Sequence, residues 1–292
     1  MSQKGGFMRN DLIMYIAGIS LIAQVSFADT FPPNTFSTVA LAKEPEPNQA
    51  SARAAIADNP ESIFTPAKFS LNLVKPAAFD ADPRPRTGIV NLTGDHHWYL
   101  FMKQGQSDFT FAGKTGIAYP IATNTKLTFV DATAGVAVAE AVLPPDKVIR
   151  NYKVNLTPGK LYRIDVKDKA GFAIDWEPQF TMTHVNQELK KPSPFNDSYA
   201  AYFYVPKNTS VIGGYWKNIG ARIIDPKGTV ALTNTTENTY FSYPVPDGMD
   251  GKIWKLEQCA NNCYLMTVPP EIARHPRELL LPKEVVKADK LN

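Results

Sequence analysis

The sequence of 292 residues contains only two cysteines and has no excess charge of either sign. Lys and Arg together number 31 and Asp and Glu 28, which gives a formal net charge of +3 at pH 7. A charge this small offers no electrostatic basis for binding nucleic acid, and no basic stripe interleaved with aromatic residues is present. We therefore expect no nucleic-acid partner.

The chain also lacks the motifs of the best-marked enzymes, namely Gly-x-Ser-x-Gly, His-Glu-x-x-His, Gly-x-Gly-x-x-Gly and the phosphate loop. Asp175 and Glu177 flank Trp176 on a predicted strand and resemble a carboxylate pair, but neither recurs in the second half of the chain. We interpret them as a solvated strand face. Lyases whose catalytic Tyr, His, Lys and Arg residues are dispersed along the chain show no motif, so the sequence does not exclude an enzyme. It favours a non-catalytic protein.

No hydrophobic run is long enough to span a membrane as a helix. The longest run, Leu12 to Phe27, is shorter than the roughly 20 residues that a span requires. Lys4 and Arg9 precede it, and small residues end it at Ala28, as in a secretory signal peptide. We expect cleavage after Ala28, export to the periplasm or the exterior, and no stable membrane insertion afterwards. Retention of the segment as an anchor is the alternative.

The two cysteines, Cys259 and Cys263, enclose three residues between two strand-like runs. In an exported protein this spacing predicts a local disulfide that staples a tight hairpin, with a contribution on the order of 2 kcal/mol. A redox-active pair is the alternative. A metal site would need more ligands than two thiols.

An internal repeat is the strongest pattern in the chain. Residues 160–164 match residues 252–256, and residues 172–178 match residues 264–270, at a constant offset of 92 residues. Turn signals recur at roughly 8–12 residue intervals, which is typical of sandwiches and jelly rolls. We therefore predict an all-β protein of two tandem β-sandwich, jelly-roll-like modules.

Composition changes along the chain predict its domain boundaries. Residues 1–28 form the signal peptide, and residues 29–65 form a Pro- and Ala-rich linker or lightly ordered arm. The first β-sandwich module covers residues 66–190. A Lys- and Pro-rich boundary follows, and residues 195–292 form the second module with a C-terminal tail.

Gly94 to Phe101, followed by Gly105-Gln106, resembles the bacterial pre-peptidase C-terminal (PPC) domain family, and so do Leu127 to Gly135 and Pro158 to Tyr162. The resemblance implies a small β-sandwich of the kind appended to secreted enzymes, with a role in binding, targeting or stability. The second module looks like a sandwich of the same type. Family members often carry an Asp just before the aromatic strand, for which the resemblance implies calcium binding, whereas this chain has His97.

Four residues are weak candidates for a metal site. His97 and Asp95 precede an aromatic strand, but His96 and His97 are neighbours whose side chains point to opposite faces of a strand. Asp247 and Asp250 lie in a Gly-containing turn, where calcium binds in some proteins and where Asp is also common for turn geometry alone. We expect no cofactor, with calcium as the one alternative.

Aromatic residues are the best functional lead. Tyr202 and Tyr204 share a strand face, and Tyr215-Trp216 adds a second pair, with Trp216 following two glycines. Exposed rings could stack on the C–H faces of sugars. Tyr162 and Trp254 occupy equivalent positions in the two copies, which predicts a repeated core role instead.

From these observations we predict an exported, non-catalytic binding or accessory protein that recognises a glycan or another cell-surface polymer. The first alternative is a secreted polysaccharide hydrolase or lyase with its site between the modules. The second is an envelope subunit that assembles through exposed sheet edges. The sequence does not indicate the oligomeric state.

Overall fold

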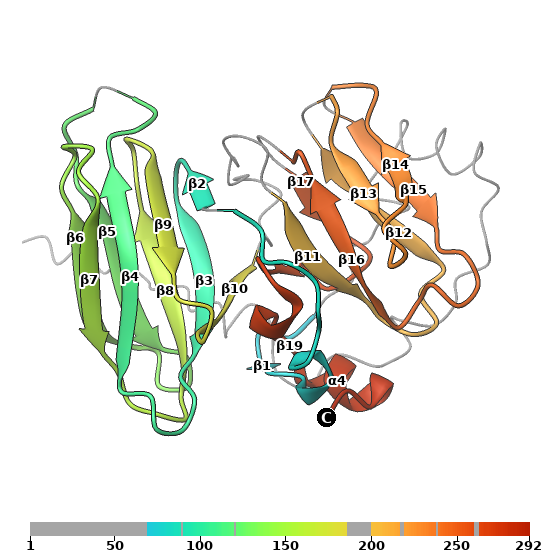
Figure 1. The fold of residues 1–292 in the computed structure, drawn as a ribbon, viewed down its shortest axis with the longest axis horizontal. Coiled ribbons are helices and arrows are strands. Elements are labelled where there is room, and N and C mark those ends of the chain that lie inside the picture. Colours follow the sequence, from blue (N-terminus) through green and yellow to red (C-terminus); the bar gives the residue numbers. More distant parts are fainter. Residues whose placement is uncertain are drawn as a thin grey trace, which may run out of the picture.

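The computed structural model describes residues 69–88, 90–119, 121–185, 200–216, 219–237, 239–259 and 263–292. The predicted signal peptide and linker lie outside this part of the chain. The described residues form two β-sandwich modules in tandem and one α-helix, α4 (Lys283–Asp289), which confirms the predicted fold class (Figure 1). None of the helices in these residues is long and apolar enough to cross a membrane.

Module 1 packs a six-stranded sheet against a four-stranded sheet. The first has the order β18 (Glu271–Ile272), β10 (Thr181–Val185), β3 (His96–Phe101), β8 (Leu161–Lys167), β5 (Thr125–Asp131), β6 (Val136–Leu143). The second has the order β2 (Val90–Leu92), β9 (Phe172–Trp176), β4 (Asp108–Thr115), β7 (Arg150–Asn155). Strict alternation of buried and half-buried residues in β4 places Phe109 and Phe111 in the core between the sheets.

Module 2 is smaller and has the same plan. One sheet has the order β11 (Ala201–Val205), β16 (Lys252–Glu257), β13 (Arg222–Ile224), β14 (Val230–Thr233). The other has the order β15 (Thr239–Pro244), β12 (Val211–Trp216), β17 (Cys263–Leu265). All pairs of neighbouring strands in module 2 are antiparallel.

The two modules repeat one topology. The order β3-β8-β5-β6 in module 1 corresponds to β11-β16-β13-β14 in module 2, and β9-β4-β7 corresponds to β17-β12-β15. The matched sequence stretches at residues 160–164 and 252–256 fall on the corresponding strands β8 and β16. Even the irregularities repeat, because β5 and β13 each have a register shift just before the Asp that begins the next turn.

The predicted core role of Tyr162 and Trp254 is confirmed. Both side chains are buried, and each bonds to the backbone five residues earlier in the chain. The Thr157 amide donates to the Tyr162 hydroxyl over 2.9 Å, and the Trp254 indole donates to the Met249 carbonyl over 3.0 Å. The same position therefore anchors the preceding turn to the core in both modules.

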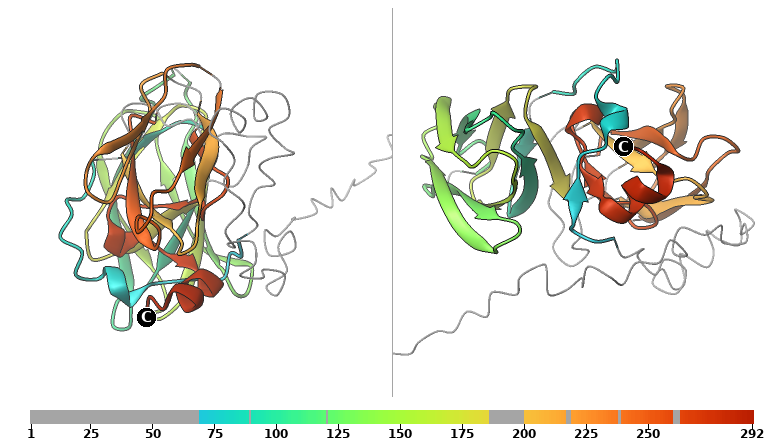
Figure 2. Two further views of the ribbon diagram at one scale, coloured as in Figure 1. Left: turned by 90° about the vertical axis from the view of Figure 1, so that its right-hand side faces the viewer. Right: turned by 90° about the horizontal axis from the view of Figure 1, so that it is seen from below.

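The segments at the two ends of the described part of the chain, called the terminal segments below, exchange places in space. Residues 69–88, which the sequence places with module 1, pack on module 2: β1 (Leu73–Val74) pairs with β19 (Leu281–Pro282), beside α4 (Figure 2). In return, β18 follows module 2 in the chain and extends the six-stranded sheet of module 1 by pairing with β10. Short 3-10 helices, η2 (Ala77–Phe79) and η3 (Pro276–Glu278), lie in these segments.

Candidate ligand-binding groove

Three of the four aromatic side chains predicted to contact a sugar are buried, so the prediction of their exposure is wrong. Trp216 is 1% exposed, because it alternates inward on β12 and stacks on Phe241 with the ring centroids 4.1 Å apart. Tyr204 faces out of its sheet, but the terminal segments cover it, and its hydroxyl donates to Asp289 over 2.7 Å. Tyr202 is covered in the same way and donates to the Pro85 carbonyl over 2.9 Å.

Tyr215 is the fourth of these residues and keeps part of its surface accessible. It lies on the outer face of the three-stranded sheet of module 2. Its ring contacts Tyr240 and Tyr264, with centroid distances of 5.1 and 5.9 Å. Tyr215 is therefore a half-buried member of a cluster of three tyrosines.

The predicted disulfide between Cys259 and Cys263 is not formed in the structure, which has both residues as buried thiols. The expected hairpin is also wrong, because β16 and β17 are not paired with each other. β16 belongs to one sheet of module 2 and β17 to the other, so the two cysteines lie next to strands of different sheets. A hydrogen bond with Cys263, together with burial, raises the pKa of Cys259, which keeps this thiol protonated.

The weak metal candidates do not converge. His97 Nδ1 lies 2.7 Å from an oxygen of Asp165, Asp95 accepts a hydrogen bond from Lys167, and Asp250 accepts one from the Asn208 amide. Asp247 lies in the turn before β16. The described residues contain no cluster of three or more His, Cys, Asp or Glu side chains that could hold a metal ion.

Asp175 belongs to a structural junction between the modules. It accepts a hydrogen bond from Arg274 over 2.6 Å, and the guanidinium groups of Arg86 and Arg274 lie 5.2 and 4.8 Å from the centroid of the neighbouring Trp176 ring. The Trp176 indole donates to the buried Glu278 over 3.0 Å. This arrangement ties the terminal segments to module 1, so a carboxylate pair at Asp175 and Glu177 has no support.

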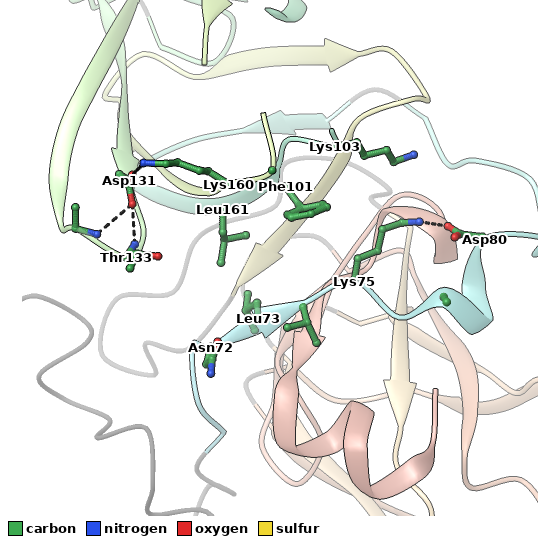
Figure 3. A pocket seen from close by; sticks show the side chains of 14 residues that line it. Asn72, Leu73, Lys75, Asp80, Phe101, Lys103, Asp131, Thr133, Lys160 and Leu161 are labelled. Atoms are coloured by element: carbon green, nitrogen blue, oxygen red, sulfur yellow. Dashed lines mark hydrogen bonds and ion pairs between the residues drawn. The ribbon is translucent and has the colours of Figure 1, made fainter. Parts of the chain in front are cut away.

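A groove of about 880 Å³ opens where the N-terminal segment crosses the ends of β3, β5 and β8 (Figure 3). Phe101 and Leu161 form its apolar floor, since they are partners in register and lie on the outer face of the six-stranded sheet. Leu73 of β1 adds one wall. The other lining residues are Asn72, Val74, Lys75, Ala77, Asp80, Lys103, Asp131, Thr133, Ala134, Gly159 and Lys160.

Charged side chains surround this floor. Lys160 donates to Asp131 over 2.7 Å, and Lys75 pairs with Asp80. Among the described residues, none forms an ion pair with the ammonium group of Lys103. Burial is the largest cause of a lowered pKa at Lys75, and the nearby charges of Lys103 and Arg277 lower it further.

Asp131 is held in its ionised form. The hydrogen bond from Lys160 lowers its pKa most, and the amides of Ala134 and Thr133 also donate to it. These two amides belong to the turn between β5 and β6, so Asp131 fixes the shape of the groove wall.

A polar strip leads away from the groove along the same sheet face. Beyond the Phe101–Leu161 pair, the register brings Tyr99 opposite Arg163, and then His97 opposite Asp165. Arg163 donates to both oxygens of Asp165 over 2.8 and 2.9 Å. Burial raises the pKa of Asp165, but the bonds from His97 and Arg163 outweigh it, so the pKa is lowered overall.

The sequence did not single out the groove residues, because they come from separate segments. Residues 72–80, 101–103, 131–134 and 159–161 meet only in the folded chain. One signal was present: His97, Tyr99 and Phe101 alternate along one strand and therefore share a face. That pattern could not tell an outer face from a core face.

Comparisons with known proteins found only weak structural similarities. No family model and no curated protein matches the chain, so the resemblance of module 1 to PPC domains stays a prediction. Among solved structures, the tandem CBM51 modules of a family 98 glycoside hydrolase from Streptococcus pneumoniae align over 72% of this chain and 88% of their own, with 8% identity and a TM-score of 0.25.

A second solved structure holds the catalytic domain and the CBM51-1 and CBM51-2 domains of ZmpB from Clostridium perfringens. It aligns over 73% of this chain and 38% of its own length, with 7% identity and a TM-score of 0.23. Likeness at scores this low carries no argument about the fold or the ligand.

Proposed function

We propose that this chain is an exported, non-catalytic binding protein for a glycan or another cell-surface polymer, and that the groove holds the ligand. The composition of the groove carries this proposal: an apolar floor with an aromatic ring, Phe101, lies beside ammonium, carboxylate and hydroxyl groups. Sugar rings have apolar C–H faces and polar rims, so they fit a surface of this kind.

The ionisable groups of the groove favour binding over catalysis. Hydrolysis of a glycosidic bond usually needs two carboxyl groups, one of them with a raised pKa so that it can act as an acid. Both carboxylates that line the groove are paired with lysines, and the pKa of Asp131 is lowered. A polysaccharide hydrolase or lyase therefore has less support than a binding protein.

Assembly through a sheet edge is the second candidate function. β6 ends the six-stranded sheet and exposes Val136, Val138 and Val142 by 60%, 51% and 44%. Exposed apolar edge strands pair readily with other chains. The oligomeric state of the protein in solution is the measurement that bears on this candidate.

The substitution Phe101→Ala tests the groove. The mature chain, residues 29–292, is applied to a broad glycan array beside the Phe101→Ala variant. Loss of one stacked aromatic contact should weaken binding of any captured glycan by about fivefold, since a contact of this kind contributes about 1 kcal/mol.

Tyr215→Ala is the matched control, because it removes a half-buried ring from module 2 outside the groove. It should leave binding unchanged. An array with no captured glycan would contradict the proposed function. A glycan lost with Tyr215→Ala but kept with Phe101→Ala would move the site to module 2.

A further inference from the structure

Among the residues that the structure describes, those that line the groove have an excess of positive charge. Lys75, Lys103 and Lys160 line it, and only two carboxylates, Asp80 and Asp131, line it with them. Each carboxylate is already paired with a lysine, so Lys103 is the third cation.

A fourth cation adds to this excess at one end of the groove. The charge of Arg277 acts on Lys75, and its guanidinium bonds to the His275 ring, with no carboxylate partner among the described residues. The Lys75 side chain is only 14% exposed, so this repulsion is poorly screened by solvent. A bound anion would offset the repulsion among Lys75, Lys103 and Arg277.

The apolar and cationic parts of the groove adjoin each other. Phe101 and Lys103 are separated by one residue at the end of β3, and Figure 3 shows Phe101 between Lys160 on one side and Lys75 and Lys103 on the other. A sugar ring on Phe101 and Leu161 would thus have ammonium groups beside its rim.

We propose that the groove binds a carboxylated polysaccharide, with a sugar ring on Phe101 and Leu161 and its carboxylate beside Lys103 and Lys75. This inference rests on the proposed function and specifies in addition that the ligand is negatively charged. A carboxylate on each sugar suits the site because an ammonium–carboxylate hydrogen bond is stronger than a neutral one. The uncharged form of the same polymer would leave Lys103 unneutralised.

A matched pair of probes tests the charge directly. Oligogalacturonate and its methyl ester have the same sugar and the same length, and they differ in the carboxylate. Isothermal titration of the mature chain should show at least tenfold weaker binding of the ester. Binding of the acid should also weaken as the salt concentration is raised from about 50 to about 500 mM, because salt screens the attraction between the carboxylates and the ammonium groups.

The substitution Lys103→Met removes the third cation while keeping a long side chain. It should weaken binding of the acid by about tenfold and leave binding of the ester unchanged, since one charge-assisted contact is lost. Lys167→Met is the control with the same change in net charge, because Lys167 pairs with Asp95 at the other end of β8. A sulfated dextran and a neutral dextran form a second pair of probes.

The outcomes separate this inference from the proposed function. Equal binding of acid and ester, or loss of acid binding in Lys167→Met but not in Lys103→Met, overturns the inference and leaves glycan binding in place. Binding of the sulfated dextran but not of oligogalacturonate overturns the inference that the anionic group of the ligand is a carboxylate. Binding of none of these probes, together with an array that captures nothing, overturns both proposals.

Discussion

Glu271 is a carboxylic acid enclosed where the two modules meet. Its side chain is 0% exposed, and neither carboxyl oxygen has a hydrogen-bond partner on another residue within the described part of the chain. Burial raises its pKa from the ordinary 4.5 to about 8, and the charge of Glu284 adds to the shift. The residue is therefore neutral at pH 7, and β18 contributes an uncharged group to its surroundings.

This raised pKa predicts a dependence of stability on pH. Between pH 4.5 and about 8 the unfolded chain releases the proton of Glu271 while the folded chain keeps it, so stability falls as pH rises through this window. The contribution is about 1.4 kcal/mol per pH unit. Glu271→Gln should remove this slope and gain stability relative to the wild type as pH increases.

Urea denaturation of the wild type and of Glu271→Gln from about pH 4 to about pH 9 measures the difference on both sides of this window. Glu140→Gln is the control, because Glu140 is a half-exposed residue of β6 paired with Lys126. A difference between Glu271→Gln and the wild type that does not change with pH would contradict the prediction.

β6 combines the properties of an edge strand with those of a docking surface. Its large exposed side chains are Val136, Val138, Glu140 and Val142, and Lys126 of β5 pairs with the one charge among them. Three of these four side chains are apolar, so a second copy of β6 could pair along this edge without burying an unpaired charge.

We predict that the mature chain self-associates through β6. Sedimentation velocity should show an average mass that rises with concentration, and Val138→Lys should reduce it to that of the monomer, because a charge on the shared face opposes edge pairing.

The control for this experiment is Val230→Lys, which places the same charge on β14, the corresponding edge of module 2, where Val230 is 47% exposed. This variant should associate like the wild type. A wild type that stays monomeric at every concentration would remove the assembly function from consideration.

At the scale of the whole molecule, the exchanged terminal segments decide how the modules are held. Arg86 precedes module 1 and Glu278 follows module 2, yet they form an ion pair beside Trp176. Most of one hydrophobic cluster consists of residues from these terminal segments, and it covers Tyr202 and Tyr204. Neither module completes its own surface without residues from the far end of the chain.

We therefore predict that Glu278→Gln weakens the whole molecule. The variant keeps a side chain of the same shape but removes the buried charge that pairs with Arg86, which then keeps only the more exposed Asp175, 3.5 Å away. The free energy of unfolding should therefore fall by about 2 kcal/mol. Urea denaturation measures the change.

Lys126→Gln is the matched surface control, because its ion pair is about half exposed and should contribute less than about 1 kcal/mol. Calorimetry of Glu278→Gln should also show broader or separate transitions for the two modules. A single unchanged transition in this variant would contradict the role of the junction.

Local patterns predicted the parts of the fold that depend on neighbouring residues. Alternation and turn residues located most strands, and the repeat located the equivalent positions of Tyr162 and Trp254. The exposure of Trp216 could not be predicted in this way. A strand has two faces, and which of them is covered depends on the sheet that packs against it.

The sequence by itself determined the all-β class and the tandem repeat, because period, turns and offset are local properties of the chain. Only the tertiary structure decided which aromatics are buried, that Cys259 and Cys263 lie next to strands of different sheets, and that Phe101 and Lys103 face a groove. These outcomes depend on segments that are far apart in the sequence, such as Leu73 and Pro282. The exchange of the terminal segments, which no local pattern records, creates both the junction and the groove wall at β1.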